Sequence, residues 1–398
     1  MTRFIQLHIL TSYPAANLNR DDLGAPKSMR FGEANRLRVS SQSLKRAWRT
    51  SDVFKAALGG EHLGTRTKEL GRNVFSALTQ GTTLEAVWND PDATGSLERL
   101  NDTRAEGIAR AIAGVFGKVK AEPKTAADAS PTQKRQDLLE SLEIEQLAHV
   151  SCEESQAASA LVEACRASDK VPDAEALSLL RKNVKAADIA MFGRMLTDDK
   201  PDSKNDKKTK IKRAQFSVEA AVQVAHAVTV HRAVAEDDFF TAVDDLNRDD
   251  AGAGHMGVSE FGAGLYYLYI CIDRTLLAEN LGGDSDLVAA SLAALATAAC
   301  TVAPTGKQAS YASRAYACFA LAEKGDDQPR NLSLAFLKPV GETDKEQAGN
   351  IGEAAVKRLI ETKASMDKVY GQELAQQSFN VFSGVGTLAE LVAFVGAE

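Results

Sequence analysis

Residues 216–230 read FSVEAAVQVAHAVTV, with an apolar residue at every even position except 226. The odd positions carry polar residues or alanine. Side chains of a β-strand point alternately to two faces, so this period of two predicts one continuous strand. His226 falls on its apolar face and is predicted to be a core histidine. His231 falls on the opposite face, so the two histidines do not share a metal.

The regions on either side show both strand and helix periodicity. RFIQLHIL (3–10) places Ile5, Leu7 and Ile9 on a buried face and Gln6 and His8 on the other. Residues 12–39 are polar and predicted to be irregular. Further strands are predicted at 264–273, 311–322 and 332–337. Helices are predicted from residue 40, through much of 60–190 (including 103–119 and 174–192), and at 285–300, 351–369 and 387–396. Strands near both ends around a helical insertion predict an α+β fold.

The composition is that of an ordinary globular protein, with 44% hydrophobic and 25% charged residues in 398. We expect no membrane span and no signal peptide, because no apolar run reaches the roughly 18 residues of a span. The five cysteines are scattered without a CxxC pair. They predict reduced, mostly buried thiols, a cytoplasmic location, and no structural zinc.

Charge is unevenly distributed along the chain. Residues 1–50 contain nine Lys or Arg and three acidic residues, a net charge of +6, whereas the whole chain carries −7, which leaves −13 for the rest. Two interpretations of this pattern are equally good: chance variation in charge, or a basic face that binds a polyanion.

The segment RVSSQSLKRAWR (38–49) concentrates this positive charge. Ser40 is a natural N-cap, and the first backbone N–H groups of a helix attract anions. The apolar stripe of the predicted helix is Leu44, Ala47, Trp48, Ser51, Phe54 and Leu58. The polar stripe is Gln42, Lys45, Arg46 and Arg49, which suits a phosphate backbone. A solvated basic face is the alternative interpretation.

Two other charged segments and a glycine motif carry weaker signals. DDKPDSKNDKKTKIKR (198–213) is predicted to be a flexible loop, with a basic finger for nucleic acid as the alternative. GAGHMG (252–257) matches the dinucleotide fingerprint only formally, because an acidic stretch precedes it and a strand follows. We predict a glycine-rich loop in which His255 either contacts a nucleotide or is a plain loop residue. No catalytic or metal-binding set stands out, so we expect no enzyme, cofactor or metal.

Six ordered motifs resemble one family. They are NLNRDD (17–22), RVSSQSLKRAWR (38–49), DIAMFGRM (188–195), AHAVTVH (225–231), DDFFTAVDDL (237–246) and AGAGHMGVSEF (251–261). The chain resembles the CasC-type backbone subunit of the type I-E CRISPR Cascade complex, a member of the RAMP superfamily. The resemblance is closest up to about residue 281.

The resemblance implies an RRM-like (ferredoxin-like) palm with a helical fingers insertion and a hairpin-like thumb. The implied divisions are palm at 1–58, fingers at 59–190, a palm strand with the charged loop at 191–232, thumb at 233–263, and the second palm part at 264–398. The loop 198–213 is longer and more charged than the family pattern.

The resemblance also implies a non-catalytic scaffold. Copies would stack along a CRISPR RNA, grip its backbone, kink it at intervals and present bases to target DNA. The implied partners are CRISPR RNA, further copies of the chain, and the other Cascade subunits: the small belly subunit, the large subunit, the five-prime-handle subunit and the repeat-endoribonuclease subunit.

Residue by residue, the motifs imply RNA contacts across three regions. The implied contacts are Asn19, Arg20, Lys27, Ser40, Gln42, Lys45, Arg46, Arg49, Met195, Thr241, His255 and Met256. A core methionine is the alternative for Met195, and a solvated loop lysine is the alternative for Lys27. An RRM-like RNA-processing endonuclease and an RNA-independent filament protein remain the alternatives for the whole chain.

Overall fold

The computed structural model describes residues 2–121, 128–168, 170–181, 185–196, 216–243, 255–341 and 350–397. The chain forms two compact units. The sheet unit comprises Met1–Leu58, Val222–Leu277 and Ser285–Glu398, and the helical unit comprises Gly59–Ala221 and Ala278–Asp284. The insertion predicted at 59–190 therefore ends earlier than the helical unit, which continues to residue 221.

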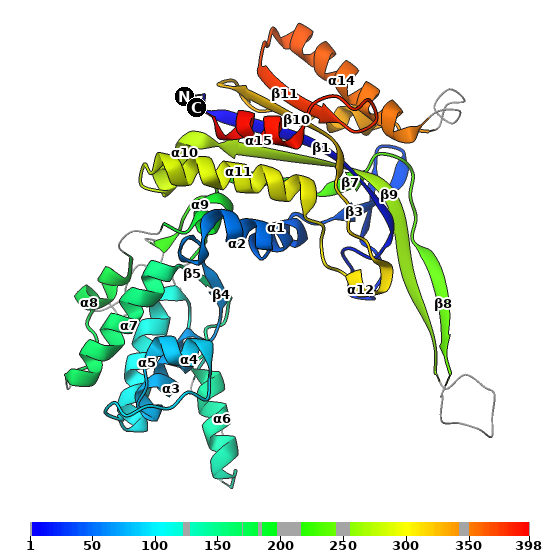
Figure 1. Cartoon of the computed structure of the whole chain (residues 1–398). Helices are drawn as coiled ribbons and strands as arrows, with labels where there is room; N and C mark the ends of the chain where they lie inside the picture. Colours follow the sequence, from blue (N-terminus) through cyan, green and yellow to red (C-terminus); the bar gives the residue numbers. More distant parts are fainter. Residues whose placement is uncertain are drawn as a thin grey trace, which may run out of the picture. The chain divides into compact units, whose positions relative to one another are not determined.

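The sheet unit is built on one large antiparallel sheet (Figure 1). Its strands follow the order β11-β10-β1-β9-β7-β3-β2, and β6 and β8 also pair with β9. The strands are β1 (Phe4–Ala16), β2 (Ser28–Phe31), β3 (Ala34–Val39), β6 (Val222–Val224), β7 (Ala227–Thr229), β8 (Glu236–Ala242), β9 (His255–Asp273), β10 (Ala317–Gly325) and β11 (Ala375–Asn380). The predicted α+β class is confirmed.

Eight helices accompany this sheet in the described part of the chain, and the last turn of one of them, α10, belongs to the helical unit. They are α1 (Ser41–Arg49), α2 (Asp52–Leu58), α10 (Arg274–Asn280), α11 (Ser285–Thr301), α12 (Gln308–Tyr311), the 3-10 helix η4 (Ser333–Phe336), α14 (Ile351–Tyr370) and α15 (Leu388–Gly396). Helix α11 contacts β1, β10, α2 and α15. Residues of η4 and α14 share an apolar cluster with β1, β9 and β10. The helices predicted at 285–300, 351–369 and 387–396 are confirmed.

Strand β1 lies in the interior of the sheet, paired with β9 on one side and β10 on the other. Ile5, Leu7 and Ile9 are buried as predicted, but Gln6 and His8 are buried too. The prediction that only one face of this strand is buried was wrong. The second face is covered because β1 and β9 share a core with α14, a partner more than 300 residues away in sequence.

A buried polar network fills that second face. His8 is hydrogen bonded through Nδ1 to the Tyr267 hydroxyl (2.8 Å) and through Nε2 to Glu323 (3.1 Å). Arg330 and Lys363 also contact Glu323, at 3.2 and 3.3 Å. Burial raises the pKa of Glu323, but the bond from His8 and the nearby positive charges outweigh it and lower this pKa to about 2. Glu323 is therefore an ionised, fully partnered acceptor.

We expect the folded chain to lose stability as the pH falls below about 6.5. Burial lowers the pKa of His8, so the unfolded chain binds a proton in this range that the folded chain does not. The contribution of neutral His8 is complete above pH 6.5 and is lost as the pH falls toward the lowered pKa. Urea midpoints at pH 7.5 and 5.5 measure the effect, and the loss should be smaller in His8→Gln. Equal losses in the two proteins would contradict this assignment.

The stretch 216–230 is not one strand. It contains β6 and β7, which both pair with β9. Val224 lies opposite Ile270, whereas Val228 lies opposite Tyr267, so β6–β7 has one more residue than β9 over this interval. This β-bulge shifts the register. It leaves His226 exposed, so the prediction of a core histidine was wrong.

Three further local predictions were wrong. Residues 12–39 contain the end of β1 together with β2 and β3. Residues 332–337 form η4 rather than a strand, because the Arg36 guanidinium donates to the Phe336 carbonyl at 2.8 Å and Leu332 and Phe336 enter the core. The helix from residue 40 breaks after α1, where the Thr50 and Ser51 hydroxyls donate to the carbonyls of Arg46 and Trp48.

The helical unit has its own core and a two-stranded sheet of β4 (Thr65–Thr67) and β5 (Ala148–Val150). Its helices are η1 (Gly60–His62), α3 (Leu70–Gln80), α4 (Leu84–Asn89), α5 (Asp102–Phe116), α6 (Pro131–Ser141), α7 (Cys152–Ala167), α8 (Ala174–Ser178), η2 (Leu179–Arg181) and α9 (Ala187–Phe192). The single helix predicted at 174–192 is instead divided among α8, η2 and α9.

All five cysteines are unpaired, and Cys165, Cys271 and Cys300 are buried, as predicted. None of the helices in the described part of the chain is both long and apolar enough to cross a membrane.

Candidate nucleic-acid interface

The start of α1 is held by two side chains. The Ser40 hydroxyl accepts from the Ser43 backbone N–H at 3.3 Å, which confirms the predicted N-cap. The Asn19 side-chain oxygen in turn accepts from the Ser40 backbone N–H at 2.9 Å. Ser40 is only 7% exposed. Of the residues expected to contact RNA, Ser40 and Asn19 therefore both help to fix the position of the helix start.

The polar side of α1 carries the predicted cationic stripe. Leu44, Ala47 and Trp48 are buried. Gln42 and Arg46 are exposed, and Lys45 and Arg49 are half-buried. Partial burial lowers the pKa of the Lys45 ammonium. The helix is fixed by its apolar side, and the stripe lies on the other side of the helix.

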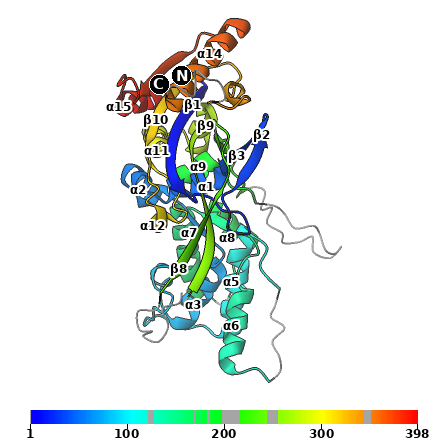
Figure 2. The ribbon, with the colours of Figure 1, turned by 90° about the vertical axis from the view of Figure 1, so that its right-hand side faces the viewer.

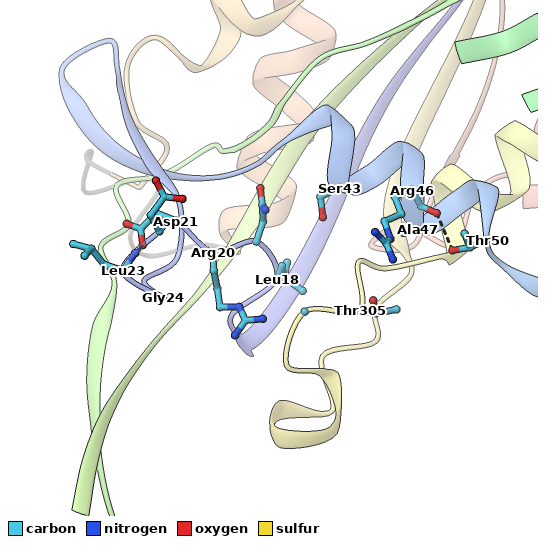
Figure 3. A pocket seen from close by; sticks show the side chains of 13 residues that line it. Leu18, Arg20, Asp21, Leu23, Gly24, Ser43, Arg46, Ala47, Thr50 and Thr305 are labelled. Atoms are coloured by element: carbon cyan, nitrogen blue, oxygen red, sulfur yellow. Dashed lines mark hydrogen bonds between the residues drawn. The ribbon is translucent and has the colours of Figure 1, made fainter. Parts of the chain in front are cut away.

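An open cavity of about 650 Å³ lies between α1 and the loop that follows β1 (Figure 3). Asn19, Arg20 and Asp21 line it from the loop, and Ser43 and Arg46 line it from α1. Arg20 and Arg46 lie on opposite sides of this cavity (Figure 3). Gln42, Lys45 and Arg49 are not among its lining residues. The cavity therefore combines two cations from separate segments with hydroxyl and amide groups and with the carboxylates of Asp21 and Asp22.

The loop keeps its shape through Asp21. One Asp21 carboxylate oxygen accepts from the backbone N–H groups of Leu23 (2.9 Å) and Ala25 (3.0 Å). The backbone of Arg20 forms an isolated antiparallel β-bridge with Pro26 across the same turn. Arg20 thus projects from an ordered turn rather than from the irregular segment predicted for this region.

Residues 305 and 306 form a third wall that the sequence did not suggest. Thr305 and Gly306 line the cavity, and a Cβ atom on Gly306 would lie 2.4 Å from the Leu18 carbonyl oxygen. Only glycine permits this approach. In the sequence, this wall is marked only by Gly306 followed by Lys307, and a glycine before a basic residue is too common to identify a site.

A second group of cations continues from the loop toward β7. The Lys27 N–H donates to the Asn19 carbonyl (2.9 Å), and the Arg38 N–H donates to the Lys27 carbonyl (2.8 Å). The Arg38 guanidinium contacts His226 Nδ1 at 2.8 Å. The pKa of His226 is lowered, first by desolvation and then by the positive Arg38 and Lys27. Arg38 belongs to the RVSSQSLKRAWR motif, but its contact with His226 was not predictable from spacing.

Strands β8 and β9 form a two-stranded antiparallel hairpin (Figure 2). Its register brings three predicted residues together. Thr241 lies opposite Met256, and Ala242 lies opposite His255. All four are exposed. The prediction of a loop at 252–257 was wrong for residues 255–257, which begin β9, and residues 244–254 lie outside the described part of the chain.

One face of this hairpin is apolar. Phe239 is paired with Val258, next to the pair of Thr241 and Met256. Phe239, Met256 and Val258 are each more than 60% exposed. Large exposed apolar patches commonly mark interaction surfaces.

Met195 is 82% exposed, so it is not a core methionine. Its neighbour Arg194 is buried and forms two hydrogen bonds with Glu154 of α7, at 2.7 and 2.8 Å. Arg194 also donates to the carbonyls of His149 (2.7 Å) and Phe216 (3.0 Å). These bonds fix the backbone from which Met195 projects. Met195 belongs to the helical unit, whereas the other predicted residues belong to the sheet unit. The charged loop 198–213 lies outside the described residues.

Among the residues that the structure describes, no three His, Cys, Asp or Glu side chains are arranged to hold a metal ion.

Comparison with known proteins places the chain in a family. The model of the CT1975-like protein family matches residues 5–391, nearly the whole sequence. The chain belongs to the CT1975-like protein family. No curated protein sequence matches it significantly.

Solved structures also resemble this CT1975-like protein over its full length. A chain of a CRISPR RNA-guided surveillance complex in a pre-nicking state is 25% identical, with a TM-score of 0.73. The match covers 98% of the CT1975-like protein and 99% of that chain. A chain of another CRISPR RNA-guided surveillance complex is 20% identical, with a TM-score of 0.65 and coverage of 99% and 100%. The second match shows similarity of fold alone.

Proposed function

We propose that this chain is a non-catalytic backbone subunit of a type I-E CRISPR surveillance complex, and that it binds the guide RNA through its phosphates. The full-length match to a subunit of an RNA-guided surveillance complex supports the complex. The cavity between Arg20 and Arg46, beside the capped start of α1, carries the RNA-binding part of the proposal.

The chemistry of the cavity suits a backbone better than a base. Its lining carries two cations, two carboxylates (Asp21 and Asp22), and hydroxyl and amide groups, and no aromatic residue is among those that line it. One Asp21 carboxylate oxygen is already engaged by two backbone N–H groups of the turn. Phosphates and 2′-hydroxyls are the features of RNA that do not depend on sequence. A protein that carries any guide must bind these features and leave the bases free to pair with DNA.

The hairpin and Met195 fit a second role within this function. Exposed apolar side chains on a two-stranded hairpin can wedge between stacked bases without reading their edges. In the proposed complex, copies of the chain lie along the guide. The hairpin residues Thr241, His255 and Met256 of one copy and Met195 of the next displace a nucleotide at regular intervals. The intervening bases pair with target DNA.

The histidine contacts favour this proposal over an RNA-processing endonuclease. Cleavage of RNA by such an enzyme needs a general base. His231 uses Nδ1 toward the Arg232 carbonyl and accepts from the Leu265 N–H at Nε2. His226 contacts Arg38 through Nδ1. His255 lies on the hairpin, where its ring centroid is 5.8 Å from that of Phe240.

Co-expression with a CRISPR RNA tests the proposal. We expect the purified chain to carry RNA. After nuclease digestion, the protected RNA fragments should increase in length stepwise with the number of bound copies. The small and large subunits, the five-prime-handle subunit and the repeat endoribonuclease should copurify when co-expressed. RNA-free filaments would favour a filament protein instead, and cleaved RNA from the isolated chain would favour the endonuclease.

A further inference from the structure

A second cavity of about 380 Å³ opens on the sheet unit, on the β2–β3–β7 side of the sheet. Sites for small ligands begin at roughly 300 Å³ and are mostly apolar with a few polar groups. The apolar lining comes from four segments that are distant in sequence, and consists of Met29, Phe31, Val228, Tyr267, Tyr269 and Phe336. We call this cavity the aromatic pocket.

The walls of the aromatic pocket are held rigidly. The Tyr269 hydroxyl donates to Gln6 at 3.0 Å. The Tyr267 hydroxyl contacts His8 and accepts from the Leu332 N–H at 3.2 Å. The Tyr267 and Phe336 rings lie 5.2 Å apart between centroids. The pocket is therefore preformed, and filling it requires little rearrangement of its rings.

The mouth of the aromatic pocket is cationic. The β-bulge between β6 and β7 places Ala225 and His226 in its lining, and Arg38, which also lines it, contacts His226 Nδ1 at 2.8 Å. Lys27 lies beside Arg38, whose backbone N–H donates to the Lys27 carbonyl at 2.8 Å. An anionic group is thus favoured directly outside an apolar, ring-lined interior.

Backbone hydrogen bonds connect this mouth to the Arg20–Arg46 cavity. Asn19, which lines that cavity, accepts from Lys27, and Lys27 accepts from Arg38. Antiparallel neighbours lie about 5 Å apart, which is less than one nucleotide step of extended RNA. A strand that leaves the Arg20–Arg46 cavity along these residues reaches the aromatic pocket within a few nucleotides.

We propose that the aromatic pocket holds one unpaired base of the bound RNA, while Arg38 and Lys27 contact its phosphate. The inference rests on the proposed guide-RNA function and adds a base-binding subsite to it. Stacking on aromatic rings tolerates every base, because each base has a π face. The subsite is therefore compatible with a guide of any sequence.

The first test compares matched variants of the full chain on one guide RNA. Tyr269→Leu removes the ring, and we expect about tenfold weaker binding in a filter assay with an unchanged salt slope, since stacking neutralises no phosphate. Tyr269→Phe keeps the ring and should restore the binding. Gln6 still accepts from the Arg330 N–H (2.7 Å), so neither variant leaves it without a donor. Tyr370→Leu, on the exposed end of α14, is the matched control.

Arg38→Ala, unlike Tyr269→Leu, should change the salt dependence of RNA binding. It removes a phosphate contact, so the slope of log affinity against log salt should fall by about 0.7, the value for one phosphate on a single strand. A purely structural role for Arg38 would leave this slope unchanged.

The second test identifies the base directly. Guide RNA with 4-thiouridine at single positions is irradiated on the assembled protein, and the crosslinked peptides are mapped. We expect crosslinks at Tyr269 or Phe31 at regularly spaced positions. Ala225→Phe, which fills the pocket from the bulge, should abolish them and weaken binding. The Ala225→Phe variant tests whether a base occupies the pocket even if the Tyr269→Leu variant does not fold.

The outcomes separate the two proposals. Absence of RNA binding by the wild-type chain overturns the proposed function itself. Normal binding by Tyr269→Leu and Ala225→Phe, without crosslinks in the pocket, overturns only the base subsite. Loss of self-association with normal RNA binding assigns the pocket to a second copy of the chain and likewise overturns the subsite.

Discussion

Replacing Arg20 and Arg46 together with alanine is expected to weaken guide-RNA binding roughly thirtyfold and to lower its salt dependence. Each cation contributes a solvent-exposed, charge-assisted contact to a phosphate, which we estimate at about 1 kcal/mol, or about 2 kcal/mol for the pair. About 1.4 kcal/mol corresponds to a tenfold change in affinity. Two lost phosphate contacts reduce the slope of log affinity against log salt by about 1.4 on a single strand.

The control for this experiment removes the same charge elsewhere. Lys357 and Lys368 lie exposed on α14, away from the cavity. Their double alanine variant changes the net charge equally, and we expect its affinity to remain within about twofold of wild type. Filter binding across a salt series with one RNA compares the two proteins. Equal losses in both would mean that RNA responds to total charge rather than to this cavity.

Replacing Arg194 with alanine is expected to destabilise the helical unit by about 3–5 kcal/mol. Arg194 and Glu154 are 3% and 1% exposed at the side chain, so the substitution leaves a buried carboxylate without its cation. The carbonyls of His149 and Phe216 lose a donor as well. The loss of the buried charge pair, rather than of packing volume, dominates this cost.

Tryptophan fluorescence can follow the helical unit alone. The chain has two tryptophans, and a Trp48→Phe background leaves only Trp88, which packs against the core of the helical unit. Urea unfolding of this background with and without Arg194→Ala gives the difference in stability. Lys118→Ala, which breaks a largely exposed pair with Glu145, should cost less than about 1 kcal/mol. Similar costs for the two variants would show that the buried pair has no special role.

The Arg194 prediction also bears on function. Because Arg194 fixes the backbone beside Met195, loss of the ion pair should also loosen the position of that exposed side chain. A milder variant, Met195→Ala, should leave stability unchanged within about 0.5 kcal/mol, since an exposed side chain has few contacts to lose.

Local sequence was sufficient where a feature depends on nearby residues. Ser40 as N-cap and the buried face of α1, with Leu44, Ala47 and Trp48, follow from the geometry of one turn and one helix face. The ends of α11, α14 and α15 agree with prediction within a residue or two, because their periodicity and caps lie within the segment. The same reasoning identified the cationic stripe of α1.

Local sequence failed where a distant partner determines the structure. The alternation in 216–230 predicts a single strand, but the register against β9 inserts a bulge and exposes His226. His8 alternates like a solvent-facing residue, yet α14 and β10 bury it.

The sequence by itself therefore determined the composition of the candidate interface: a capped helix start, a row of cations, and the motifs of a family. Only the tertiary structure decided which of these residues share a cavity. Arg20 and Arg46 line one cavity because the loop after β1 lies beside α1, and Gly306 lines its third side. Periodicity is a property of neighbouring residues, whereas cavities and registers arise from contacts between segments hundreds of residues apart, which no local pattern specifies.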